Sequence, residues 1–176
     1  MLTYLSTWGY VLVALFIGVG AGVQLTMISA ISRERGSVEA VWTSFVATGM
    51  IIVAFLLGKV LSNQNITLSQ PFQKPILLLI ILVFFILALI FATKGLNWYF
   101  ALTGILAVPL LVGAGLLGPK MGIGVYISAT IAGQLIGSIF VDHIGAFGGV
   151  QISISFQRII GVILLIVGVI LVRGLR

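Results

Sequence analysis

Polar residues recur every four positions along one otherwise apolar stretch, and these side chains could do chemistry. The series is Tyr126, Thr130, Gln134, Ser138 and Asp142. Each step of four residues advances about 400° around an α-helix, so the side chains form a slowly turning stripe on one side. A buried amide or hydroxyl needs a hydrogen-bond partner. The stripe therefore either bonds to neighbouring helices or lines a polar cavity that receives a small molecule.

Three further residues occur in a similar setting. Gln24 and Ser44 are polar side chains inside two earlier apolar stretches, and Trp98 opens a third. Cavity lining and interhelical hydrogen bonding are equally good interpretations of Gln24 and Gln134, whereas the structural interpretation is favoured for the Ser and Thr residues. The predicted substrate-cavity residues are Gln24, Ser44, Trp98, Tyr126, Thr130, Gln134 and Ser138.

Asp142 and Arg158 carry charges that conflict with the helix ends they occupy. Asp142 ends one apolar stretch and Arg158 begins the next. The helix dipole disfavours an anion at the C-terminal end and a cation at the N-terminal end. An ion pair between the two residues would relieve both conflicts. The pair is interpreted as a structural staple or, because His143 beside it could titrate near neutral pH, as a gate.

The chain has 22 glycines, and two pairs have the spacing of helix–helix contacts. Gly18 with Gly22 and Gly133 with Gly137 are each four residues apart. Small residues at this spacing let two backbones approach closely. Tight packing is the simplest interpretation, and a sliding interface in a transporter is compatible with it. The GxGxxG sequence at 113–118 is not interpreted as a nucleotide site, because no strand precedes it.

Composition defines the environment of these residues. Of 176 residues, 61% are hydrophobic, and only nine Lys or Arg and three Asp or Glu are charged. Soluble domains are usually nearer 25% charged, which argues against a cytosolic enzyme. With no Cys and a single His, no disulfide or metal site is predicted. The sequence lacks a P-loop and any catalytic constellation, so neither an enzyme nor a cofactor is predicted. Basic residues at the ends of apolar stretches suggest loop anchors rather than nucleic-acid binding.

Six stretches are long and apolar enough to cross a bilayer, whose core of about 30 Å needs about 20 helical residues. Inside lipid, backbone N–H and C=O groups must bond to one another, so a spanning segment is either a helix or a strand of a closed barrel. The stretches do not show the alternation of polar and apolar residues that barrel strands have, so we predict an all-α integral membrane protein. The predicted spans are 8–31, 38–61, 75–93, 98–118, 122–141 and 156–172. They form one compact transmembrane domain, 1–176, with one long polar loop at 62–74. Because only residues 94–97 separate two spans, five or six crossings are predicted.

Several short motifs, clearest between Trp98 and Val172, resemble those of a known family. They are Asn97-Trp98-Tyr99, Thr103-Gly104, Pro119-Lys120-Met121-Gly122, Gly133-Gln134-Leu135 with Ser138, Asp142-His143-Ile144-Gly145 with Gly148, and Arg158-Ile159-Ile160-Gly161 with Gly168. Gln24 and Ser44-Phe45 match more weakly. Together, these motifs resemble those of the short YdcZ-like family of the drug/metabolite transporter superfamily. The sequence departs from that pattern at Ile28, where the family often has Asn, and by containing the extra span 75–93.

The resemblance implies a multi-pass small-molecule transporter of the bacterial cytoplasmic (inner) membrane. Short members of the superfamily look like half of a larger transporter, which implies that two copies pair. Every predicted span except 75–93 takes part in the resemblance.

The basic residues do not favour one orientation in the membrane. With six crossings, five lie on the side of the N-terminus and four on the other: Lys59, Lys74, Lys120, Arg173 and Arg176 against Arg33, Arg35, Lys94 and Arg158. The count becomes four against five if 75–93 does not cross. Because basic residues normally fix orientation, this balance predicts dual topology and an antiparallel homodimer, or a pair with a close homologue. Two opposed copies would form the inverted repeat used for alternating access.

These features predict a secondary transporter or facilitator that works as a dimer by alternating access. Its small-molecule site is expected between Gln24, Gln134 and Trp98. The alternative is a non-transporting scaffold or assembly subunit of a larger membrane complex, because low charge and glycine packing suit that role equally. A polar cavity near the bilayer midplane would favour the transporter, and dry packing around both glutamines would favour the scaffold.

Overall fold

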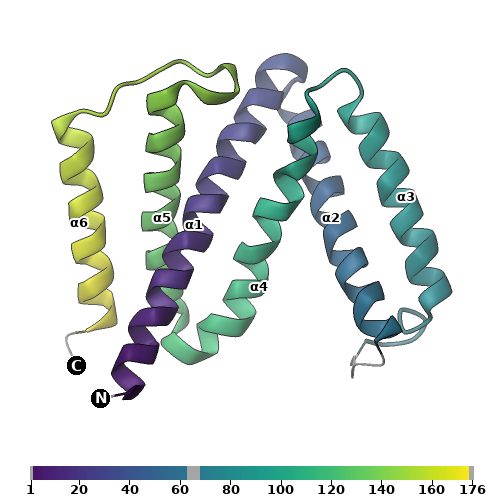
Figure 1. The fold of residues 1–176 in the computed structure, drawn as a ribbon, viewed down its shortest axis with the longest axis horizontal. Helices are drawn as coiled ribbons and strands as arrows, with labels where there is room; N and C mark the ends of the chain where they lie inside the picture. The colour runs from purple at the N-terminus through teal and green to yellow at the C-terminus, as the bar shows by residue number, and fades with distance from the viewer. Residues whose placement is uncertain (1, 63–67, 175–176) are drawn as a thin grey trace. The chain divides into compact units, whose positions relative to one another are not determined.

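The computed structural model describes residues 2–62 and 68–174, with side chains from residue 8 onward. In this part of the chain all regular structure is helical, and six helices are long and apolar enough to cross a membrane. They are α1 (Leu2–Arg35), α2 (Ser37–Leu61), α3 (Pro75–Thr93), α4 (Thr103–Met121), α5 (Ile123–Ile144) and α6 (Phe156–Arg173) (Figure 1). The predicted all-α membrane fold class is therefore confirmed. Arg176 and part of the predicted loop 62–74 lie outside the described residues.

Two short 3-10 helices adjoin the long ones, and single glycines make the sharpest turns. The 3-10 helices are η1 (Trp98–Leu102), before α4, and η2 (Ala146–Gly148), after α5. Gly36 joins α1 to α2 at φ 99°, and Gly122 joins α4 to α5 at φ 88°. Both residues combine a positive φ with an extended ψ, a conformation in which a side chain would be strained by roughly 1–3 kcal/mol. Glycine therefore lets one helix follow another after a single residue.

The helices group into two compact units. Unit 1 comprises Met1–Ala30 and Pro109–Arg176, and unit 2 comprises Ile31–Val108. The boundary falls inside α1 and inside α4, in the latter immediately before Pro109. Proline has no backbone N–H, so the α4 hydrogen-bond ladder lacks one donor at this point. The organisation of the chain as one transmembrane domain stays a prediction.

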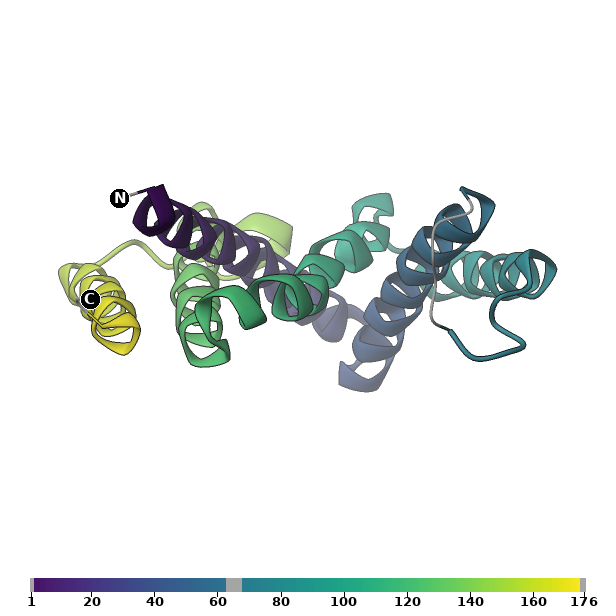
Figure 2. The same cartoon turned by 90° about the horizontal axis from the view of Figure 1, so that it is seen from below.

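In unit 2, α2 and α3 pack side by side, as both views show (Figure 1) (Figure 2). Val46 and Ala47 of α2 are buried against Leu89 of α3. Most other side chains of α3 are exposed in this unit. This pattern suits a helix with one face on protein and the rest of its surface toward lipid.

Arg35 caps the C-terminal end of α3. Its guanidinium donates hydrogen bonds to the carbonyl oxygens of Ala92, at 2.8 Å, and of Lys94. The last carbonyls of a helix lack helical partners and carry partial negative charge, so a cation stabilises them. Arg35 therefore fixes the end of α3 within unit 2, a role beyond that of a loop anchor.

In unit 1, α1, α4, α5 and α6 surround a core of mostly small apolar residues. The buried members are Val11, Ala14, Val125, Tyr126, Ala129, Ala132 and Val169. Ala114 and Leu117 of α4 pack against this group. Since α5 contributes the largest share, it is the central helix of the unit.

Aromatic and basic side chains collect at one end of unit 1. The Arg173 guanidinium carbon lies 3.6 Å from the centre of the Trp8 ring. The Lys120 ammonium lies 5.2 Å from the centre of the Tyr10 ring. Both distances are within the range of cation–π attraction. The start of α1 and the ends of α4 and α6 therefore share one end of the unit, with the aromatic and basic anchors expected at a membrane surface.

Candidate functional site

Helices α1 and α5 meet through four glycines that bring the two backbones into direct contact. A Cβ on any of them would overlap a carbonyl oxygen of the facing helix: Gly18 at Thr130, Gly22 at Gln134, Gly133 at Leu15 and Gly137 at Val19. The glycine spacing predicted close packing, and the structure adds that the two pairs face each other reciprocally. No room for a solute remains between backbones at this distance, so any binding surface of α5 must lie elsewhere around the helix.

The hydroxyl groups of the α5 stripe are bonded within unit 1. The Tyr126 hydroxyl donates to the carbonyl oxygen of Leu110 in α4, at 2.7 Å. The Thr130 hydroxyl lies 2.9 Å from a carbonyl oxygen of its own helix, and the Ser138 hydroxyl lies 3.1 Å from one. Tyr126 and Thr130 are also buried. These contacts match the structural interpretation of the stripe, and a role for the three residues in a cavity stays a prediction.

The two glutamines differ in their surroundings. Gln134 places its backbone against Gly22, and its side chain is half-buried. Its amide makes no hydrogen bond with another residue that the structure describes. Gln24 is also half-buried, but it lies two residues beyond Gly22, about 200° further around α1. Gln24 is therefore on the side of α1 that faces away from α5, and the α1–α5 contact does not bring the two amides together.

Ser44 and Trp98 belong to unit 2, whereas the other predicted cavity residues belong to unit 1. Ser44 is buried, and its carbonyl oxygen accepts a hydrogen bond from the Thr48 hydroxyl at 2.7 Å. Trp98 is 76% exposed, and its ring centre lies 6.2 Å from that of Tyr99. The site role of this exposed indole stays a prediction.

Asp142 and Arg158 form an ion pair between the end of α5 and the start of α6. A guanidinium nitrogen of Arg158 lies 3.4 Å from a carboxylate oxygen of Asp142, with the two side chains 29% and 37% exposed. The predicted approach of the two charges is thus confirmed. Partial exposure and a single long contact indicate a weak bond, since exposed pairs contribute about 0–1 kcal/mol. Whether the pair acts as a staple or a gate stays a prediction.

The loop after α5 folds back over the end of that helix. The Ile152 amide donates to the carbonyl oxygen of Asp142 at 2.9 Å. The Gln151 side-chain amide donates to the carbonyl oxygen of His143 at 2.9 Å. The Ile154 amide lies 3.4 Å from Nδ1 of His143, which accepts its hydrogen. His143 therefore holds the loop in position, and its predicted part in a gate would operate through that contact.

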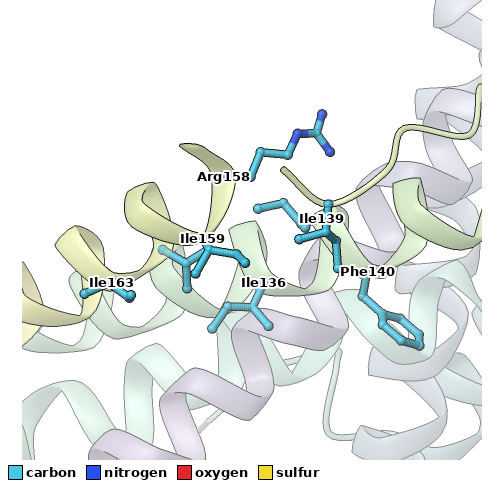
Figure 3. A pocket seen from close by; sticks show the side chains of 8 residues that line it. Ile136, Ile139, Phe140, Arg158, Ile159 and Ile163 are labelled. Atoms are coloured by element: carbon cyan, nitrogen blue, oxygen red, sulfur yellow. The ribbon is translucent and has the colours of Figure 1, made fainter. Parts of the chain in front are cut away.

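An apolar groove of about 260 Å³ lies between α5 and α6 (Figure 3). Its lining consists of Ile136, Ile139, Phe140, Ile154, Arg158, Ile159, Val162 and Ile163, so Arg158 is its one charged member. None of the apolar residues of this groove is among the polar and glycine residues from which a site was predicted. A signal was present: each helix has three apolar residues at the spacing i, i+3, i+4, namely 136, 139 and 140, and 159, 162 and 163. Such residues share one helix face.

A family model described as "Putative inner membrane exporter, YdcZ" matches residues 9–171. The matched range contains the glycine contact, the ion pair and the groove. No curated protein and no solved structure matches the chain.

Proposed function

The chain belongs to the YdcZ family of inner membrane exporters, and we propose that it exports a small organic molecule as a dimer of oppositely inserted copies. The family match over residues 9–171 is the observation that carries the transporter role. It also makes the chain a multi-pass protein of the inner membrane, in a family of transporters rather than enzymes. The dimer and its alternating access are the proposed additions.

Contacts within unit 1 support six crossings. Lys120, at the end of α4, lies beside Tyr10, near the start of α1. The chain reaches Lys120 after α1, α2, α3 and α4, so an even number of crossings must separate the two residues. A non-crossing α3 would instead place Lys120 on the opposite side of the membrane from Tyr10. Full crossing by α3 leaves the basic residues balanced at five against four, a distribution that does not fix orientation.

The residues of unit 1 suggest different roles in such a transporter. Gln134 is the best candidate for contact with the substrate, because its amide has no hydrogen-bond partner among the described residues and lies at the margin of the α1–α5 contact. Amides inside a membrane need polar partners. Gln24 in unit 1 remains a proposed cavity residue, as do Ser44 and Trp98 in unit 2. The hydroxyls of Thr130 and Ser138 bond their own helix.

A transport assay tests the export proposal. Purified protein in proteoliposomes would be screened against pools of small organic solutes, with release measured over time. We expect release of at least one class of solute and a loss of about tenfold or more in rate for Gln134→Leu, because a desolvated polar contact is removed. Ser128→Ala, which removes a hydroxyl bonded within α5 and lies outside the predicted cavity residues, is the matched control and should retain the rate. If correctly inserted dimers moved no solute, the scaffold alternative would be favoured.

The orientation of the C-terminus tests the dimer. The chain has no Cys, so one cysteine added after Arg176 provides a unique site for a membrane-impermeant maleimide. We expect substantial labelling from each side of the membrane. Three Lys added after Arg176 should place that end in the cytoplasm and abolish transport, while three Gln should change neither. Co-expression with a variant carrying three extra Lys after Lys94 should restore transport. One-sided labelling of the unmodified chain would contradict an antiparallel dimer.

A further inference from the structure

The groove between α5 and α6 combines apolar walls with a single charge. Ile136 and Ile139 of α5 face Ile159 and Ile163 of α6, and Arg158 lies at the rim with its guanidinium directed out of the groove (Figure 3). We propose that this groove binds a single-chain organic anion, such as a medium-chain carboxylate. The alkyl chain would lie among the isoleucines, and the anionic head would meet Arg158.

The size of the groove favours one alkyl chain. Its volume is about 260 Å³, whereas pockets that enclose drug-sized ligands usually measure about 300–1,000 Å³. A single chain fits this space, while a phospholipid would leave its second chain outside. The occupant we assign is therefore a free single-chain amphiphile rather than a lipid of the bilayer.

The charge of the groove favours an anion. The three acidic residues of the chain are Glu34, Glu39 and Asp142, all at helix ends, and none of them lines the groove. A cationic amphiphile would therefore find no counter-charge along the walls, and the Asp142 carboxylate near the rim is already paired with Arg158. A carboxylate, in contrast, can accept two parallel hydrogen bonds from one guanidinium.

Arg158 retains donors for such a ligand although it is paired. A guanidinium has five N–H donors. Among the described residues the one side-chain partner of Arg158 is Asp142, at 3.4 Å, longer than the roughly 2.7–2.9 Å of strong charge-assisted bonds. Asp142 is thus a weakly held counter-ion that competes with the ligand for Arg158. Because binding requires no export step, a binding experiment tests this site independently of the transport proposal.

Binding of decanoate to the purified protein in phosphatidylcholine nanodiscs tests the proposal. Isothermal titration calorimetry should detect saturable binding of decanoate and much weaker binding of decanol and decyltrimethylammonium. Arg158→Gln should weaken decanoate binding about tenfold or more, and Ile163→Trp, which fills the groove, should do the same. Asp142→Asn should strengthen binding several-fold, because it removes the competing carboxylate. Arg173→Gln, a basic residue against Trp8 at the other end of unit 1, should leave the affinity unchanged.

Opposite effects of Arg158→Gln and Asp142→Asn are the distinguishing result. If both substitutions weakened binding equally, the ion pair would be only a staple, and the assignment would be overturned. If decanol bound as tightly as decanoate, the assignment of an anion site would also be overturned. If phosphatidylglycerol displaced decanoate in an Arg158-dependent manner, the groove would be identified as a lipid site instead. Should Arg158→Gln fail to fold, Asp142→Asn and Ile163→Trp still give opposite predicted shifts.

Discussion

Helix α5 makes two contrasting contacts within unit 1. Toward α1, glycines of both helices lie against carbonyl oxygens of the other, so that the backbones touch. Toward α6, isoleucines separate the helices and leave a groove of about 260 Å³. The same helix thus forms a closed contact on one face and an open one on another, and the size of the side chains determines which.

The difference has a physical basis in the lipid environment. Lipid tails are as apolar as the side chains, so the hydrophobic effect does not drive helices together and close van der Waals packing must do so. Glycine permits that approach. Isoleucine is branched at Cβ and stiff at χ1, so the facing rows of α5 and α6 cannot collapse into the space between them. The closed α1–α5 contact is therefore suited to holding the two helices in a fixed arrangement. The open α5–α6 contact is suited to reversible binding of a ligand.

The largest effect is expected when the closed contact is opened. In Gly133→Val, the new side chain would overlap the carbonyl oxygen of Leu15 and crowd Gly18, so α1 and α5 must separate. Overpacking usually costs about 1–3 kcal/mol, and more where backbone must move. We expect a strong fall in thermal midpoint, or loss of monodisperse protein in detergent. Gly161→Val on α6 is the control, because a Cβ there would meet no described atom within 4 Å outside its chain neighbours and the backbone of its own helix. An equal fall in thermal midpoint for both variants would contradict the conclusion that the α1–α5 contact is the more tightly packed one.

The sequence predicted the closed contact better than the open one. The spacing of Gly18 with Gly22, and of Gly133 with Gly137, indicates close approach whichever helix is the partner, because small residues have one main use in lipid-embedded helices. The ion pair of Asp142 and Arg158 followed from charges at unfavourable helix ends. Both inferences depend on local rules, which a single sequence reveals.

The open contact depends on which helices become neighbours, and local rules do not determine this. Apolar residues at i, i+3, i+4 are compatible with contact to protein or to lipid, so the spacing around Ile136 and Ile163 marks an apolar helix face but does not identify what the face contacts. The capping of α3 by Arg35 also joins residues 57 positions apart. Likewise, the position of Gln24 on the face of α1 opposite the α5 contact could not be predicted, because it depends on which face of α1 packs against α5.

A smaller effect is expected where α5 contacts α4. Tyr126 is 2% exposed, and its hydroxyl donates to the Leu110 carbonyl oxygen at 2.7 Å. Tyr126→Phe removes that hydrogen bond and keeps the ring in the core, so it should lower the free energy of unfolding by about 1 kcal/mol. Thermal unfolding of the two proteins in the same detergent measures the difference. Tyr10→Phe, which keeps the ring beside Lys120, should show almost no change; a comparable loss there would mean that hydroxyl burial is not the cause.

The smallest effect on stability is expected at the ion pair beside the open contact. Asp142→Asn removes one charge of a pair whose members are 29% and 37% exposed, so the free energy of unfolding should fall by no more than about 1 kcal/mol. Because salt screens exposed charges, the difference between the two proteins should shrink further at high ionic strength. Thermal unfolding at low and high salt measures both quantities. A loss as large as that of Gly133→Val would show that the pair holds α6 against α5, and the open contact would then be a fixed arrangement like the closed one. A small, salt-sensitive loss together with tighter decanoate binding would instead separate the two faces of α5 by role, one structural and one for a ligand.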